Sequence, residues 1–270
     1  MILYPNAKIN IGLNVLNKRD DGFHEIETFM YPIALTDILT INFSSDNNKV
    51  KLTTTGINID GDINENLIVK AYKIIDKRYN LPALNFHLHK SIPFGAGLGG
   101  GSADCAFAIK GINNLCKLNM SVKQMQDISA ELGSDCPFFI ENRPAIAKGR
   151  GEKLDIYNLN MDNYIFVVVI PPIHISTKDA YSLVKPSKKQ QILKESLGVN
   201  VKLWKNSIYN DFEDSVFVQA PKIESIKSRL YDLGAVYSSL SGSGASVFAI
   251  FEKTPKLDSV FPKDYFVWVS

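Results

Sequence analysis

Apolar and polar residues alternate at two places in the first third of the chain, and this alternation predicts two strands. The first runs from Ala7 to Val15 and the second from Leu84 to His89. Because successive side chains of a strand point to opposite faces, Lys8 and Asn10 are expected side by side on one face. A solvated face is the ordinary interpretation of such a polar row. This face carries one charge, however, and Gly12 within a strand often marks close approach by a ligand or another backbone.

Apolar residues spaced three or four positions apart predict helices. One is expected from a cap at Asn64 to about Tyr79, and another begins near Ser102. The run Ser121-Val122-Lys123-Gln124 is a capping-box signature for a third, which ends at Gly133. A further capping signature stands at 176–179, and a helix is expected over 221–233, with proline at its start and Gly234 after its end.

Further strands are predicted at 39–43 and 50–54, across the polar turn 44–49, and at 165–170, 235–237, 247–251 and 265–269. The order in the last third predicts a βααββαβ-like sandwich of antiparallel sheet and helices. We therefore expect an α+β protein with two domains, residues 1–160 and residues 161–270. The Lys/Gln/Ser-rich segment 185–196 is expected to be a mobile or helical connection.

Charge and cysteine content narrow the class of protein. The 270 residues include 30 basic and 28 acidic side chains, so there is no basic field of the kind that binds nucleic acid. The longest apolar run, 164–170, is too short to span a bilayer, and residues 1–5 lack the regions of a signal peptide. Three cysteines without C-x-x-C spacing favour neither a disulfide framework nor a zinc site. These features predict a cytoplasmic globular protein that binds neither nucleic acid nor membrane.

The segment from Pro93 to Asp104 contains five glycines between a predicted strand and a predicted helix. Glycines allow positive φ and close approach to a ligand, and a helix start offers unpaired N–H groups, so this segment predicts a phosphate cradle. Gly95 to Gly100 also matches the G-x-G-x-x-G dinucleotide pattern, but no acidic residue follows a second strand about 20 residues on. Gly-Lys-Ser is absent, which excludes a Walker A loop.

Asp135 follows Gly133 and precedes Pro137, which is able to begin another helix. From the residue alone, an N-cap carboxylate is the ordinary interpretation. His87 and His89 alternate on a strand, but no third ligand is spaced to help them bind a metal, so we expect a solvated face.

Three segments together resemble a known superfamily of small-molecule kinases. They are Pro5-Asn6-Ala7-Lys8-Ile9-Asn10-Ile11-Gly12-Leu13, the turn from Arg19 to Ile26, and the glycine-rich segment. The last resembles the ATP loop of the galactokinase, homoserine kinase, mevalonate kinase and phosphomevalonate kinase (GHMP) superfamily. The first two resemble the members that act on diphosphocytidyl methylerythritol, and the resemblance runs almost end to end. It implies a ribosomal protein S5 domain 2-like N-terminal domain and a ferredoxin-like C-terminal domain.

The resemblance also implies roles for residues. ATP and Mg²⁺ are the implied cofactors, with the metal near Ser102 and no acidic ligand singled out. Asp135 takes the proton from the substrate's 2-hydroxyl, while Lys8 holds Asp135 ionised and stabilises charge on the γ-phosphoryl group. The segment 239–246 resembles the superfamily's third motif, which folds back over the ATP loop. The residues expected to bind ATP are Asn66, Lys90, Pro93, Gly95, Ala96, Gly97, Leu98, Gly99, Gly100, Gly101, Ser102, Ala103, Gly242 and Ser243.

The substrate side is expected to include Asn10, Phe23, His24 and Tyr181. We expect Phe23 and Tyr181 to sandwich the cytosine ring while His24 reads its edge, against the alternative that both aromatics are core residues. Where Phe23 stands, the family often has tyrosine. The resemblance implies a small-molecule substrate of the non-mevalonate isoprenoid pathway and a monomer or weak homodimer. Another kinase of the superfamily, an NAD(P) oxidoreductase and an RNA-binding module remain alternatives.

Overall fold

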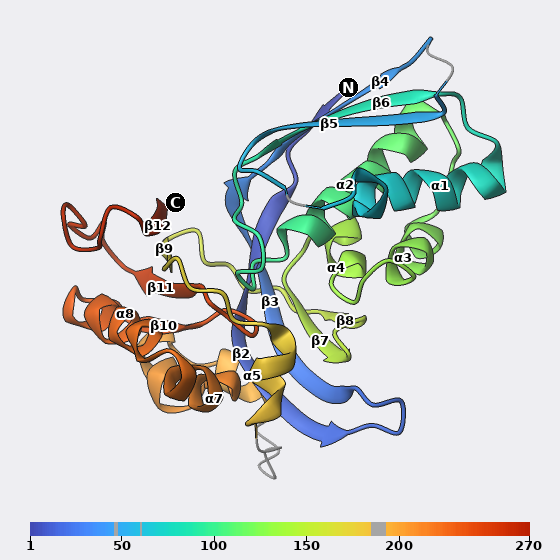
Figure 1. Cartoon of the computed structure of the whole chain (residues 1–270). Coiled ribbons are helices and arrows are strands. Elements are labelled where there is room, and N and C mark those ends of the chain that lie inside the picture. Colours follow the sequence, from blue (N-terminus) through green and yellow to red (C-terminus); the bar gives the residue numbers. More distant parts are fainter. Residues whose placement is uncertain (46–47, 60, 185–192) are drawn as a thin grey trace. The chain divides into compact units, whose positions relative to one another are not determined.

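The chain folds into two compact units whose segments interleave along the sequence (Figure 1). This computed structural model describes residues 1–45, 48–59, 61–184 and 193–270. The first unit contains Met1–Ala7, Ala34–Phe94 and Gly99–Arg143, and the second contains Lys8–Ile33, Gly95–Leu98 and Pro144–Ser270. Because of this interleaving, the compact units are not continuous stretches, and the expected domain boundary at residue 160 stays a prediction.

The first unit is built on a four-stranded sheet in the order β1-β4-β6-β5. Its strands are β1 (Ile2–Leu3), β4 (Ile38–Phe43), β6 (Leu84–Lys90) and β5 (Val50–Gly56). All but β1 were predicted, yet β4 and β5 are not neighbours across their turn, because β6 lies between them. β6 is antiparallel to β4 and parallel to β5. A parallel pair needs a crossover connection, and helix α1 (Leu67–Tyr79) supplies it.

Helices of the first unit gather along one face of this sheet (Figure 1). Besides α1 they are α2 (Gly100–Leu115), α3 (Val122–Ala130) and α4 (Cys136–Glu141), and the short 3-10 helix η1 (Ile63–Glu65) precedes α1. The capping box at Ser121 is confirmed. The predicted cap at Asn64 is wrong: Asn64 lies in η1, and the side chain of Asn66 caps α1 by accepting a hydrogen bond from the backbone N–H of Ile68.

Most of the residues in β2 (Asn6–Lys18) and β3 (His24–Thr36) belong to the second unit, where they form a sheet in the order β2-β3-β7-β8. Strand β2 is buried on both faces from Asn6 to Val15, so the solvated face considered for Lys8 and Asn10 is wrong. Strands β7 (Ala145–Gly149) and β8 (Lys153–Ile156) were not predicted. They have five and four residues, too few to show a clear alternation.

A second sheet of this unit has the order β10-β11-β9-β12, with antiparallel neighbours throughout. Its strands are β9 (Ile165–Ile170), β10 (Tyr237–Leu240), β11 (Val247–Phe251) and β12 (Phe266–Val269). In chain order the sheet reads 2-3-1-4, the strand order of a ferredoxin-like domain. The helix that the βααββαβ order places before the final strand is wrong, because residues 252–265 form turns, bends and irregular chain.

Helices α5 (Thr177–Ser182), α7 (Phe212–Gln219) and α8 (Pro221–Asp232) enclose a core with this sheet. The 3-10 helix η2 (Val201–Asn206) was not predicted, and neither was α7. Within the segment 185–196, expected to be a connection, residues 185–192 lie outside the described part of the chain, and the rest belongs to α6 (Leu193–Leu197). Across the described ranges, no helix has the length and apolar character needed to cross a bilayer.

Candidate active site

Three positions of the glycine-rich loop have a backbone conformation that residues with a side chain rarely adopt. Gly95, Gly97 and Gly99 all have positive φ, between 63° and 78°, a region that favours glycine. Gly99 then serves as the N-cap of α2 without any side-chain cap, so the first turn of α2 presents backbone N–H groups at the loop. The strand, loop and helix order expected from the sequence is confirmed, and it is an arrangement suited to holding phosphate.

The segment 239–246 lies directly against this loop. The hydroxyl of Ser241 donates to the carbonyl of Gly97 over 3.1 Å, and both the hydroxyl and the backbone N–H of Ser246 donate to the carbonyl of Ala96. A Cβ atom at Gly97 would overlap the carbonyl oxygen of Ser241. The predicted folding of 239–246 onto the loop is therefore confirmed, although the binding roles of Gly242 and Ser243 stay predictions.

Lys8 also contacts the loop, at the same Gly97 carbonyl. Its side chain is 3% exposed, and its Nζ atom donates to the Gly97 carbonyl at 3.1 Å and to Asn10 Oδ1 at 2.5 Å. Asn10 in turn donates to the hydroxyl of Thr28, which donates to the carbonyl of Gly12. This chain of hydrogen bonds fixes the position of a buried ammonium group at the glycine loop. Thr28 was missed from sequence because it stands on β3 without any local motif.

Asp135 occupies the N-cap position of α4, with Pro137 in the first turn as predicted. Asp135 therefore is the N-cap residue that the ordinary interpretation expects, but its carboxylate makes no capping hydrogen bond to the described helix. The preceding turn lies near α2, since a Cβ atom at Gly133 would be 3.9 Å from Ser102 Oγ. Lys8 belongs to the second compact unit and Asp135 to the first, and their pairing stays a prediction.

Beneath the end of the loop lies a buried cluster of three charges. Lys90 is 1% exposed and forms ion pairs with Asp37 and, at 2.7 Å, with Asp104. Asp37 also accepts hydrogen bonds from the backbone N–H groups of Ser91 and Ile92, which fixes the chain as it leaves β6. The cluster therefore carries two carboxylates and one ammonium group. Burial raises the pKa of Asp104 to about 7 against the opposing effect of Lys90.

The expected role of Lys90 in binding ATP stays a prediction, but its surroundings are unusual for a lysine. As an isolated residue it would be a surface lysine, but it is buried, because Asp37 and Asp104 compensate its charge. Its amine lies close to the loop helix, since a Cβ at Gly100 would come within 3.0 Å of Nζ. Neither Asp37 nor Asp104 was predicted as a site residue, because their positions along the sequence do not indicate that they pair with Lys90.

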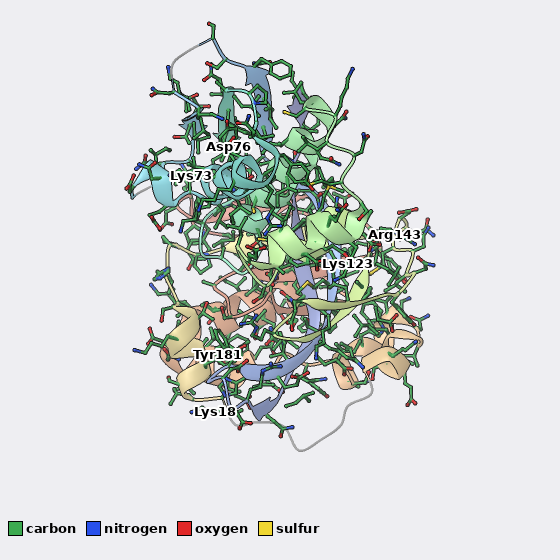
Figure 2. All side chains as sticks on the ribbon, turned by 90° about the vertical axis from the view of Figure 1, so that its right-hand side faces the viewer. Lys18, Lys73, Asp76, Lys123, Arg143 and Tyr181 are labelled. Carbon is green, nitrogen blue, oxygen red and sulfur yellow. The ribbon has the colours of Figure 1, made fainter. Side chains whose placement is uncertain are left out.

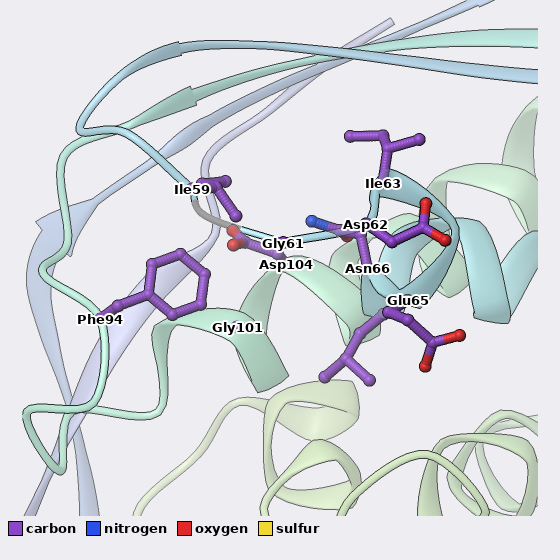
Figure 3. Close-up of a pocket in the computed structure, with 10 residues that line it drawn as sticks. Ile59, Gly61, Asp62, Ile63, Glu65, Asn66, Phe94, Gly101 and Asp104 are labelled. Atoms are coloured by element: carbon purple, nitrogen blue, oxygen red, sulfur yellow. The ribbon is translucent and has the colours of Figure 1, made fainter.

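A pocket of about 200 Å³ opens beside the first turn of α2 in the first unit (Figure 3). Its walls combine apolar side chains with a few polar groups, as small-molecule sites do. The pocket contains Asn66, which the resemblance places among the ATP-binding residues, together with Phe94 and Gly101 of the loop region. The full set of lining residues is Ile59, Gly61, Asp62, Ile63, Glu65, Asn66, Leu67, Phe94, Gly101 and Asp104.

The three aromatic residues expected at the cytidine lie in the second unit. His24 stacks on Tyr181 with ring centroids 4.7 Å apart and an interplanar angle of 14°. Tyr181, labelled in Figure 2, also meets Phe212 edge to face. Phe23 is 54% exposed and has the Arg150 guanidinium 4.9 Å from its ring, so the alternative that Phe23 is a core residue is wrong. In this structure the ring stacked on Tyr181 is that of His24, and a Phe23–Tyr181 sandwich stays a prediction.

The side chains present fit a magnesium ion that arrives with a nucleotide. In the described ranges, no group of three or more His, Cys, Asp or Glu side chains is arranged to hold a metal ion. Ser102 offers a hydroxyl in the first turn of α2. Mg²⁺ in kinase sites is commonly bound by one or two protein oxygens together with substrate phosphates and water. Such a donor set suits a nucleotide-borne ion better than a permanent metal centre.

Two family models match the chain. They are described as GHMP kinases N terminal domain, over residues 66–143, and GHMP kinases C terminal, over residues 193–262. The first match includes the glycine-rich loop, Asp135 and the pocket residue Asn66, and the second includes the segment 239–246. The fold and the site together define a GHMP kinase, which is an enzyme of the phosphotransferase class.

Named relatives extend over nearly the whole chain. A 4-diphosphocytidyl-2-C-methyl-D-erythritol kinase of Parabacteroides distasonis is 47% identical over 270 residues, which cover 99% of this chain and 98% of the relative. One from Bacteroides fragilis is 46% identical and covers 96% of both chains. This chain belongs to the 4-diphosphocytidyl-2-C-methyl-D-erythritol kinase family.

Solved structures agree with this assignment. The crystal structure of a 4-(cytidine 5'-diphospho)-2C-methyl-D-erythritol kinase has a TM-score of 0.75 to this chain at 29% identity, and the match covers 93% of this chain and 90% of the other. A mevalonate kinase reaches a TM-score of 0.75 at 12% identity, covering 100% and 98% of the two chains. At that identity the likeness concerns the fold alone.

Proposed function

We propose that this chain transfers the γ-phosphoryl group of ATP to the 2-hydroxyl of 4-diphosphocytidyl-2-C-methyl-D-erythritol. The products are the 2-phosphate and ADP, in the non-mevalonate isoprenoid pathway. The observation that carries the proposal is the 47% identity, over 99% of the chain, to a relative named as this kinase. The glycine-rich loop and the buried Lys8 beside it supply the chemistry that the reaction needs.

The triphosphate of ATP lies in the glycine loop, and its nucleoside occupies the pocket beside α2. Positive φ at Gly95, Gly97 and Gly99 supports this, because it turns the loop backbone tightly ahead of the α2 N-terminus, where N–H groups and the helix dipole favour phosphate. Apolar walls at Ile63 and Phe94 suit a flat base. The proposed contact of Lys90 with adenosine is indirect, since its amine is engaged by two carboxylates.

Phosphoryl transfer depends mainly on positioning and on charge stabilisation. Asp135 accepts the proton of the substrate hydroxyl as general base, and Lys8 stabilises the charge that develops on the transferred group. The hydrogen bonds from Lys8 to Asn10 and Gly97 support this role, because they hold the ammonium group in place before the reaction. Ser102 would help to hold Mg²⁺ brought by the nucleotide, and the ion would neutralise part of the phosphate charge.

Recognition of cytidine belongs to Phe23, His24 and Tyr181 in this proposal. Their rings offer stacking surfaces, each worth about 1–3 kcal/mol per base. The exposed ring of Phe23 supports a ligand-facing role, since it gains little from packing in the free protein. His24 reads the cytosine edge in this proposal.

An ADP-release assay with a panel of acceptors tests the proposal. We expect release to depend on diphosphocytidyl methylerythritol, with mevalonate, homoserine and galactose giving at most background. Comparable release with one of those three acceptors would assign the chain to another GHMP activity. NADH binding at micromolar concentration without ATP binding would instead revive the dinucleotide interpretation of the loop.

A further inference from the structure

One carboxylate oxygen in the pocket stands out by its lack of a partner. Asp104 is 3% exposed, and its Oδ2 accepts the ion pair from Lys90 at 2.7 Å. Its Oδ1 atom is buried and has no hydrogen-bond partner among the described residues. The same residue lines the pocket, and Figure 3 shows its carboxylate directed toward the space between Ile59 and Phe94. Protein interiors seldom leave a charged acceptor in this state.

The surrounding charges raise the energetic cost of leaving this oxygen without a hydrogen-bond donor. Lys90 is shared between Asp37 and Asp104, so once both carboxyl groups are ionised the buried cluster has one more negative than positive charge. An uncompensated buried charge is costly, and a donor from a ligand would lower that cost. Lys90 and Asp37 also hold Asp104 in place, because both lie within the same ion-paired network and Asp37 is bound to the backbone at Ser91 and Ile92.

A hydrogen-bond donor faces the same pocket. The Oδ1 atom of Asn66 accepts the N–H of Ile68 at 2.9 Å in capping α1, which leaves the amide nitrogen of Asn66 for other partners. In Figure 3 that nitrogen points from η1 and α1 toward the Asp104 side of the pocket. The pocket therefore offers one acceptor and one donor between apolar walls that include Ile59 and Phe94.

We propose that Asp104 selects adenine by accepting a hydrogen bond from its 6-amino group, while the Asn66 amide nitrogen donates to a neighbouring ring nitrogen. The inference rests on the proposed binding of ATP and adds a determinant of nucleotide specificity to it. Adenine presents an amino donor beside a ring acceptor, which complements this pair. Guanine and hypoxanthine carry an oxygen at position 6, and two acceptors would then face each other across a buried contact.

Direct binding measurements with nucleotides that differ at position 6 provide the test. At about pH 8.5, above the pKa of about 7 for Asp104, ATP is compared by calorimetry with purine riboside triphosphate, which lacks the amino group, and with inosine triphosphate, which carries the oxygen. We expect ATP to bind the wild-type protein about 10- to 100-fold more tightly than purine riboside triphosphate, the range for a hydrogen bond to a charged group. Inosine triphosphate should bind more weakly still.

The variant Asp104→Asn should reduce the preference for ATP over purine riboside triphosphate to about 3-fold or less. Glu131→Gln is the matched control: it removes the same charge from an exposed carboxylate of the same unit, and it should keep the wild-type preference. The comparison of three nucleotides on wild-type protein stands even where Asp104→Asn fails to fold. Equal binding of ATP and purine riboside triphosphate to wild-type protein, with ATP still turned over, overturns this inference alone. Absence of binding by all three overturns the proposed function as well.

Discussion

The ammonium group of Lys8 donates a hydrogen bond to the carbonyl of Gly97, 3.1 Å away, so the first long strand and the glycine loop meet at a buried charge. Because Asn10 holds the same ammonium group at 2.5 Å, the charge stays in place without a ligand. Fixed charge of this kind stabilises a transition state without reorganisation at the moment of reaction.

Replacing Lys8 with methionine keeps the length of the side chain and removes its charge. Lys8→Met should depress turnover by about 10²-fold or more while changing ATP affinity much less, because the charge acts mainly on the transferring phosphoryl group. Steady-state kinetics with calorimetric ATP binding measure both quantities. A variant that loses thermal stability but retains turnover would show that Lys8 has a structural role.

Asp135→Asn should retain the fold and ATP binding but lose about 10²–10⁴ in turnover, the range for a positioned general base. Loss of stability should be small, since the carboxylate does not cap α4. Circular dichroism and single-turnover kinetics test the two expectations. Near-normal turnover would remove Asp135 from the mechanism.

Gly97→Ala places a Cβ atom against the carbonyl of Ser241 in addition to the strain of positive φ. We expect it to destabilise the protein by about 2 kcal/mol or more and to weaken ATP binding, because the loop must move away from 239–246. Gly234→Ala is the matched control: its φ is also positive, but nothing lies within 4 Å of the added atom. The two variants should differ clearly in melting temperature, and equal shifts would contradict the contact.

The raised pKa of Asp104 predicts a pH dependence of stability. The pKa of this carboxyl group is near 3.9 in the unfolded chain and about 7 in the folded protein, so the folded protein keeps the proton up to a higher pH. The stability that the protonated Asp104 contributes is therefore fully present below the pKa of the unfolded chain, and it is lost as pH rises toward 7. Relative to wild type, nucleotide-free Asp104→Asn should gain about 1–3 kcal/mol of unfolding free energy between pH 5 and pH 8. Urea unfolding at several pH values measures this gain, and a difference that does not change with pH counts against it.

Phe23→Ala and Tyr181→Ala should each raise the KM for the cytidine substrate about 5- to 150-fold, and leave the KM for ATP nearly unchanged. A uridine analogue should be a poor substrate, because it exchanges the amino donor of cytosine for an acceptor. A parallel rise in the KM for ATP would show that the two aromatics support the fold and do not contact the base.

Local pattern was sufficient for some of this structure. The alternation in β2 and β6 and the glycine-to-helix transition at α2 are short-range features, and all three were predicted correctly. Asn64 and Asn66 are both good capping residues, so the sequence could not decide between them. The choice depends on the turn η1, whose own cap is Asp62.

Features that depend on distant residues could not be predicted from local pattern. Lys90 is buried because its charge is paired with that of Asp37, which is 53 residues away in the sequence but adjacent in the fold. The two buried faces of β2 likewise depend on later segments, such as Asn210, which bridges to Leu13. His24 stacks on Tyr181, a residue 157 positions away in the sequence. Local pattern could not predict this pair, because neither residue stands in a motif that points to the other.

Identification of the phosphorylated product shows directly whether this chain phosphorylates the 2-hydroxyl of its substrate. Wild-type protein is incubated with ATP, Mg²⁺ and 4-diphosphocytidyl-2-C-methyl-D-erythritol, and the product is examined by ³¹P and ¹³C NMR. We expect one new phosphomonoester whose phosphorus couples to the carbon at position 2, in amounts equal to the ADP released. A phosphate on another hydroxyl, or ADP release without a phosphorylated acceptor, would contradict it.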